Sequence, residues 1–210
     1  MHHAAPARPP RRKWRGWWLR QLHAWHWISA AISLVAMLLF SVTGITLNHA
    51  ATISATPETV QQTGTLPASL LARLQGDGTA PLPDAVARGV TVAVGLDPAG
   101  RPAEWSDDEV YIALPRPGGD AWVSIDRATG AIEAEVTDRG WISYLNDLHK
   151  GRNAGDAWFW FIDIFAVACV LFTVTGLLLL QFHARNRPST WPVVIAGLIL
   201  PVVLALFFIH

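Results

Sequence analysis

The chain has 210 residues, equal numbers of acidic and basic side chains, and no formal net charge at pH 7. Apolar residues make up 51% of it, 11 residues are Trp, and the single Cys excludes an internal disulfide and cysteine-based metal or redox motifs. Six basic residues and no acidic residue lie in the first twenty positions, ahead of an apolar run, which indicates a membrane topology signal rather than nucleic-acid binding.

Residues 1–20 are predicted to form a basic cytoplasmic tail, because Lys and Arg favour the cytoplasmic side of a membrane. The stretch from Trp27 to Leu47 has no charge and reaches the roughly 20 residues that a bilayer-spanning helix needs. Residues 21–49 are therefore predicted as the first transmembrane helix. Its apolar core is too long for a cleaved signal peptide, so we expect an uncleaved anchor.

Residues 50–140 are predicted to form a periplasmic domain. It begins with a polar, Pro-containing linker over Thr52–Leu66 and a short amphipathic helix over Ala68–Leu74, and a turn of helix is possible over Pro83–Arg88. The β-branched run Val90–Leu96 is predicted as a strand. Runs of alternating polarity with Gly and Pro turns between them predict an antiparallel meander. These runs are Glu109–Leu114, Ala121–Asp126 and Ala131–Val136.

The C-terminal part returns to the membrane. Residues 141–155 are predicted as an interfacial amphipathic helix and loop, 156–183 as the second transmembrane helix, 184–190 as a cytoplasmic turn and 191–210 as the third helix. The predicted fold class is an α-helical membrane protein with three transmembrane helices and a small periplasmic α+β domain. The charge pattern favours a topology with the N-terminus on the cytoplasmic side and the C-terminus on the outer side.

Two similar six-residue phrases lie inside the first two spans, and histidines bracket both. The phrases are LFSVTG at Leu39–Gly44, between His26 and His49, and LFTVTG at Leu171–Gly176, between His149 and His183. Haem iron binds neutral imidazole, and two facing helices can hold a porphyrin between them. The repeat therefore predicts haem iron ligated by histidines from two helices.

The spacing decides which histidines can share an iron. At 1.5 Å per residue, His26 and His49 lie about 35 Å apart along one helix, so each must pair with a histidine from elsewhere. We predict an outer site of His49 with His149, and an inner site of His26 with His183. His23 is the alternative inner ligand, or a group that holds a propionate or a quinone.

The glycines of the two phrases have two possible roles. Gly176 and His183 lie within about 20° of one helix face, so this glycine would clear space for a porphyrin beside His183. Gly44 lies about 140° from His49 and clears space less directly. The competing interpretation is that both glycines serve close helix packing.

Three charged residues are further candidates. Asp163 is the only acid inside a span, where it would orient a ligand histidine, relay protons or pair with a basic residue. Lys150 and Arg152 would neutralise haem propionates or attract an anionic iron chelate. The competing interpretation is that these residues form an ordinary interfacial loop and that the histidines lie at headgroup level as amphipathic rings. His2, His3 and His210 are predicted to be incidental.

Several segments carry a resemblance to a known family. Val123–Ile132 resembles the strand-turn-strand element of PepSY domains. Leu22-His23-Ala24-Trp25, Leu148-His149-Lys150-Gly151 and the two Val-Thr-Gly phrases resemble the PepSY-associated transmembrane family. Larger members of that family resemble ferric-siderophore reductases that carry b-type haem on histidines. This chain has fewer helices and a single soluble module.

The resemblance implies an inner-membrane protein with one or two b haems that passes electrons to a periplasmic acceptor, such as the iron of a ferric siderophore. The sequence has no flavin or nicotinamide fingerprint, so a quinol or a partner reductase subunit would be the donor. Catalytic residues are not predicted. The alternative is an anchored, non-enzymatic PepSY module that binds an envelope protein such as a peptidase. A third possibility is a subunit whose histidines complete sites in a larger reductase.

Overall fold

The computed structural model describes residues 11–53 and 56–209, with the side chains of residues 11–13 left out. The chain divides into two compact units. The helical unit combines the chain up to Leu38 with the chain from Ile162 on, and the mixed unit spans Leu39–Phe161. Each unit is described by itself below.

Three helices of the described chain are long and apolar enough to cross a membrane, as predicted. They are α1 (Arg11–Asn48), α5 (Gly155–His183) and α6 (Thr190–Phe208). Helix α1 begins ten residues before the predicted start, because the basic stretch is rich in Arg, which favours helix. The remainder of the predicted basic tail, residues 1–10, lies outside the described residues.

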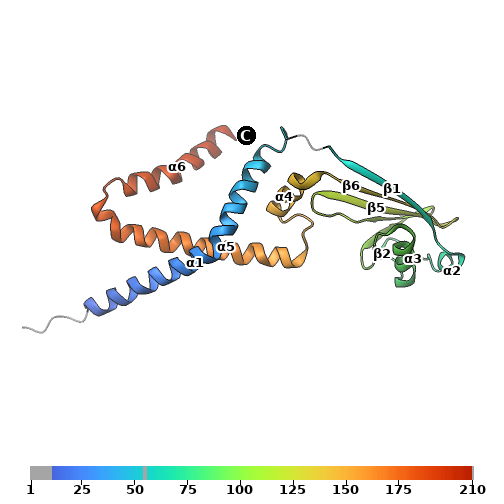
Figure 1. Cartoon of the computed structure of the whole chain (residues 1–210), viewed down its shortest axis with the longest axis horizontal. Coiled ribbons are helices and arrows are strands. Elements are labelled where there is room, and N and C mark those ends of the chain that lie inside the picture. The colour runs from blue at the N-terminus through green and yellow to red at the C-terminus, as the bar shows by residue number, and fades with distance from the viewer. Residues whose placement is uncertain (1–10, 54–55, 210) are drawn as a thin grey trace, which may run out of the picture. The chain divides into compact units, whose positions relative to one another are not determined.

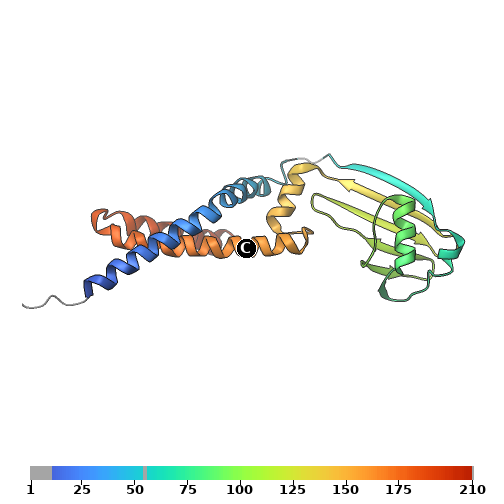
Figure 2. The ribbon, with the colours of Figure 1, turned by 60° about the horizontal axis from the view of Figure 1, so that its bottom comes forward.

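Small polar side chains line α1 within the helical unit. Ser29 and Ser33 are buried one turn apart, and each hydroxyl donates to a backbone carbonyl one turn earlier, of Trp25 and of Ser29 respectively, at 2.7 Å. These bonds satisfy the hydroxyls inside the same helix, so the small side chains permit close approach of a neighbouring helix. The first half of α1 crosses α5 in both views of the ribbon (Figures 1 and 2).

The mixed unit contains one six-stranded sheet with the order β1-β6-β5-β4-β3-β2, and every neighbouring pair is antiparallel. The predicted meander is therefore confirmed. The strands are β1 (Glu58–Thr65), β2 (Thr79–Pro81), β3 (Pro102–Trp105), β4 (Glu109–Ala113), β5 (Gly119–Asp126) and β6 (Ala131–Asp138).

The predicted strand at Val90–Leu96 is wrong, because most of this run belongs to helix α3 (Asp84–Val94). Val86, Val90 and Val94 are spaced four apart and lie buried on one helix face against the sheet. Burial of that face outweighs the β preference of valine. The helix ends at Gly95, whose φ of 71° is left-handed. Figure 2 shows α3 lying over one face of the sheet.

The predicted linker at Thr52–Leu66 is also wrong in its second half, because Glu58–Thr65 forms strand β1. All eight residues pair with β6, from Glu58 opposite Asp138 to Thr65 opposite Ala131. The strand lies at the sheet edge with most side chains exposed, so it lacks the apolar alternation by which strands are recognised. Helix α2 (Ala68–Leu71) is shorter than predicted.

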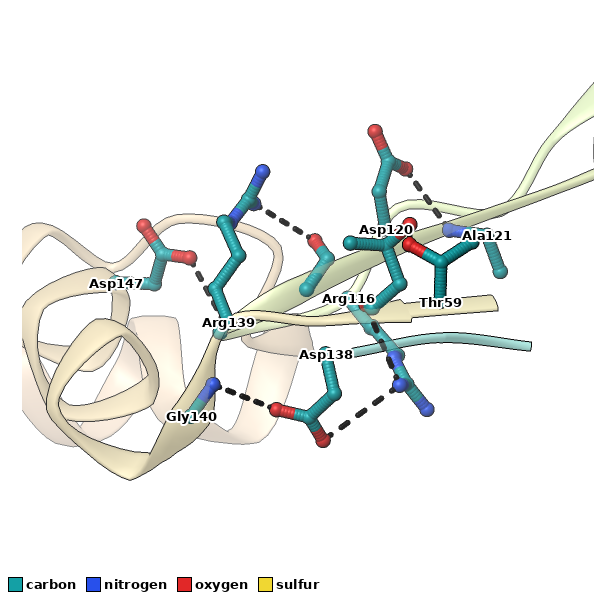
Figure 3. A network of polar contacts seen from close by, with 11 residues as sticks. Thr59, Arg116, Asp120, Ala121, Asp138, Arg139, Gly140 and Asp147 are labelled. Carbon is teal, nitrogen blue, oxygen red and sulfur yellow. Dashed lines mark hydrogen bonds and ion pairs between the residues drawn. The ribbon is translucent and has the colours of Figure 1, made fainter. Parts of the chain in front are cut away.

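Helix α4 (Gly140–Lys150) follows β6 and is fixed to the end of the sheet by polar contacts (Figure 3). The buried Asp147 carboxylate accepts a 2.8 Å bond from the backbone N–H of Gly118. The guanidinium of Arg139 donates to the carbonyl of Gly119 at 3.0 Å, and Asp138 accepts from the N–H of Gly140 at 2.7 Å. These contacts set the direction of α4, which carries His149 near its C-terminus.

Candidate imidazole sites

The first six-residue phrase, on α1, receives the imidazole of His149 from α4. Nδ1 of His149 lies 2.8 Å from Oγ1 of Thr43, and the ring of Phe40 lies beside the imidazole with centroids 5.1 Å apart. A Cβ built on Gly44 would meet Cε1 of His149 at 3.4 Å. The ring is half-buried, so Thr, Gly and Phe of one phrase together hold one imidazole.

The second phrase, on α5, receives the imidazole of His26 from α1 in the same manner. Nδ1 of His26 lies 3.1 Å from Oγ1 of Thr175, and the rings of His26 and Phe172 stack at 4.7 Å with an interplanar angle of 16°. A Cβ on Gly176 would approach Cε1 of His26 to 3.2 Å. That distance is tighter than most real Cβ contacts, so a glycine is the residue that suits this position.

We call the shared pattern Phe-x-x-Thr-Gly the imidazole cradle. In each case the imidazole comes from an element other than the helix that carries the cradle. The sequence prediction used only the glycines and related them to His49 and His183 on their own helices. It missed the roles of Phe40, Thr43, Phe172 and Thr175. The repeat itself was the signal that could have found them, because both side chains recur at the same spacing.

The helical unit contains a cavity of about 830 Å³ whose wall includes both predicted inner ligands, His26 and His183. Gly176 also lines it, in keeping with the shared face that Gly176 and His183 have on α5. The remaining lining is mostly apolar, with Arg187 among the polar residues. These remaining residues are Phe172, Thr173, Leu177, Leu179, Leu180, Asn186, Arg187 and Thr190.

The two predicted outer ligands, His49 and His149, lie at different faces of α1. His149 lies over Gly44, whereas His49 is exposed and its Nδ1 bonds to the carbonyl of Ile45 on its own helix at 2.9 Å. The angle of about 140° between Gly44 and His49 explains this separation. The structure therefore gives His149 a cradle and leaves His49 outside it.

His23 is exposed and its Nδ1 bonds to the carbonyl of Leu19 at 2.7 Å, so its ring lies along its own helix. Asp163, Lys150 and Arg152 are also exposed. Within the described chain, none of these three side chains takes part in an ion pair, since the ion pair found there joins Arg116 and Asp138. The predicted His2, His3 and His210 lie outside the described residues.

Two further bonds hold α4 and the start of α5 around His149. The hydroxyl of Thr46 donates to the side-chain oxygen of Asn146 at 2.8 Å, which links α1 to α4. The indole N–H of Trp158 donates to the carbonyl of Leu148 at 2.9 Å. Asn146 is buried, so its bond fixes the position of α4 one turn before His149.

Comparison with known families agrees with this architecture. A family model described as "Putative PepSY_TM-like" matches residues 17–210. The chain belongs to this family. None of the curated proteins or solved structures compared with it gives a match. The PepSY_TM-like assignment confirms the family resemblance seen in the sequence, and it agrees with membrane helices combined with a small α+β domain.

Proposed function

We propose that this PepSY_TM-like chain is a b-type haem protein of the bacterial inner membrane that carries electrons to a periplasmic acceptor. One observation carries the proposal. His26 and His183 belong to the wall of one largely apolar cavity between membrane-spanning helices. Two imidazoles can fill both axial positions of a six-coordinate b haem, because the porphyrin occupies the other four positions of the iron.

The cavity and its donors fit such a group. Its volume of about 830 Å³ falls in the range of small-molecule and cofactor sites. Within the described residues, no three His, Cys, Asp or Glu side chains gather as a metal site, so a ligand set of two imidazoles suits haem better than a bare ion. Arg187, at the cavity wall, would face a propionate. Bound haem would supply one-electron chemistry.

The arrangement favours one haem rather than two. His26 and His183 share a cavity, whereas His49 and His149 lie on different sides of α1. We therefore propose His26 and His183 as the iron ligands of a single inner site. His149, in its own cradle, would serve a second site only with a ligand other than His49.

The direction of electron flow follows from the predicted topology. The basic N-terminal region favours the cytoplasmic side, so the inner site would receive electrons from a quinol or from a partner reductase subunit. The periplasmic acceptor would be ferric iron in an anionic chelate, for which the exposed Lys150 and Arg152 provide positive charge.

The test is a visible spectrum of the full chain, purified in detergent from haem-replete cells, in oxidised and dithionite-reduced forms. We expect a Soret band that shifts on reduction, and its loss in His26→Ala and His183→Ala. His23→Ala is the matched control, because His23 lies on the same helix with its ring outside the cavity. A colourless wild-type protein, or a Soret band unchanged in both cavity variants, would refute the proposal.

A second function, binding of an envelope protein, is favoured by the sheet face opposite α3. Tyr111 and Trp122 stack there with centroids 6.1 Å apart, and the face is rich in carboxylates. Burial raises the pKa of Tyr111, and the charges of Asp120 and Glu104 raise it further. A colourless chain that copurifies with a periplasmic peptidase, and loses it in Trp122→Ala, would establish this function instead.

A further inference from the structure

The direction of the Thr175 hydroxyl proton decides which ring nitrogen of His26 donates a hydrogen bond. A hydroxyl has one proton to donate and two lone pairs to accept with. Oγ1 of Thr175 lies 2.6 Å from the carbonyl of Leu171 and 3.1 Å from that of Phe172, so its proton points to the backbone of its own helix. Towards the imidazole of His26 the hydroxyl oxygen can therefore only accept a hydrogen bond.

Nδ1 of His26 faces two acceptors and no donor. It lies 3.1 Å from Oγ1 of Thr175 and 3.2 Å from the carbonyl oxygen of Phe172. A bare Nδ1 lone pair would meet oxygen lone pairs there, so Nδ1 carries the proton and donates it. In the neutral ring the lone pair then belongs to Nε2, the nitrogen that is free to bind a metal.

The same reasoning applies to His149 at the other cradle. Oγ1 of Thr43 lies 2.9 Å from the carbonyl of Leu39 and 3.2 Å from that of Phe40, so it donates to its own backbone. Nδ1 of His149 lies 2.8 Å from Oγ1 and donates to it. Two independent cradles therefore fix the same tautomer.

We propose that Thr175 and Thr43 are positioning residues that fix Nδ1 of His26 and of His149 as a proton-bearing nitrogen, which leaves Nε2 as the nitrogen able to bind a metal. The binding of haem iron by Nε2 rests on the proposed function, whereas the tautomer assignment rests on the hydrogen bonds alone. Such an outer hydrogen bond fixes ring orientation and raises ligand basicity. Because the acceptor is an uncharged hydroxyl, the imidazole gains less negative character than it would beside a carboxylate.

The other described histidines have the same Nδ1 bond, but to a carbonyl of their own helix rather than to another element. Nδ1 of His183 bonds to the carbonyl four residues earlier, that of Leu179, at 2.8 Å, and His23 and His49 do the same on α1. These three rings are exposed and follow their own helix. His26 and His149 are the two of these five whose Nδ1 bonds to another element, so His26 is the inner ligand whose ring a second helix holds in place.

The experiment uses the full chain, prepared without haem, in detergent micelles with ¹⁵N-labelled histidine. Nitrogen chemical shifts report the tautomer of each ring, and titration with haem reports affinity. We expect Nδ1–H for His26 in the wild type and a partial shift of the tautomer equilibrium towards Nε2–H in Thr175→Val, where the carbonyl of Phe172 remains as the second acceptor. Haem affinity should fall about 10- to 100-fold, the usual effect of removing such a partner. The reduction potential should rise, because the imidazole becomes a weaker electron donor to iron.

Two variants separate the hydrogen bond from other effects. Thr175→Ser restores the hydroxyl and should restore the tautomer, the affinity and the potential. Thr173→Val removes a hydroxyl that bonds to the carbonyl of Cys169 rather than to a histidine, and it should leave the tautomer of His26 unchanged. An unchanged tautomer in Thr175→Val, or a Thr173→Val effect of equal size, would overturn the inference. A wild type that binds no haem refutes only the proposed function, because the nitrogen shifts still decide the tautomer.

Discussion

Gly118 is the point at which the sheet and helix α4 meet, and replacing it by Ala should loosen α4. Its φ is +70°, a left-handed conformation that favours glycine. A Cβ there would lie 2.7 Å from Cα of Tyr144, a backbone atom of α4 that cannot move alone. The same residue donates its N–H to Asp147. We therefore expect Gly118→Ala to push α4, with His149, away from the cradle at Thr43.

The expected decrease in the free energy of unfolding of Gly118→Ala has two parts. A left-handed conformation costs a non-glycine residue about 1–2 kcal/mol. Forcing an extra carbon into a packed contact adds about 1–3 kcal/mol, so the total is about 2–5 kcal/mol. Gly78 provides the matched control, since its φ is +65° and nothing lies within 4 Å of a Cβ built on it. Gly78→Ala should cost only the first part, about 1–2 kcal/mol.

Amide hydrogen exchange of the full chain in detergent measures both effects as opening free energies of local segments. Gly118→Ala should lower the protection of α4 and of the adjacent end of β5 by more than Gly78→Ala lowers that of β2 and β3. The ¹⁵N shifts of His149 should change in the first variant only. Equal losses in the two variants, or an unchanged His149, would refute the idea that this contact positions α4.

Two further predictions concern the soluble domain. Ile112 is fully buried against α3, so Ile112→Ala should destabilise the domain by about 2–5 kcal/mol, measured by the same exchange experiment. The backbone N–H and the hydroxyl of Thr129 bond to Asp126 and lower the pKa of its carboxyl. Because the pKa of Asp126 is lower in the folded than in the unfolded chain, its bonds to Thr129 stabilise the domain at pH values above the unfolded pKa of 3.8. This stabilisation is lost as the pH falls through the pKa that Asp126 has in the folded domain. Asp126→Ala should therefore remove part of the acid dependence of domain unfolding, followed by a denaturant titration at several pH values. An identical pH profile would contradict this.

Much of the architecture could be predicted from local patterns. The three spans follow from apolar length alone, because a bilayer-crossing helix satisfies its own backbone and needs about 20 apolar residues. The strands from Glu109 to Asp138 follow from alternating polarity and from Gly-containing turns. Both signals act within a single segment and require no partner.

Other elements depend on partners that no local pattern reveals. Val90 lies in a helix because α3 buries a face of Val and Ala against the sheet, which outweighs the β preference of the run. Strand β1 exists because β6 offers it eight paired residues, although its own side chains are mostly exposed. In both cases the stabilising contacts join segments distant in sequence.

The candidate site shows the same division. The sequence by itself determined that histidines bracket two copies of one phrase and that Gly176 shares a helix face with His183. Only the tertiary structure decided that His26 fills the second cradle and that His149 fills the first, because the rotation of α1 about its axis and the crossing of neighbouring helices determine which rings meet. The position of His49 on another face of α1 follows already from its angle of about 140° to Gly44. Sequence spacing gives positions along and around one helix, whereas packing between helices selects the partner.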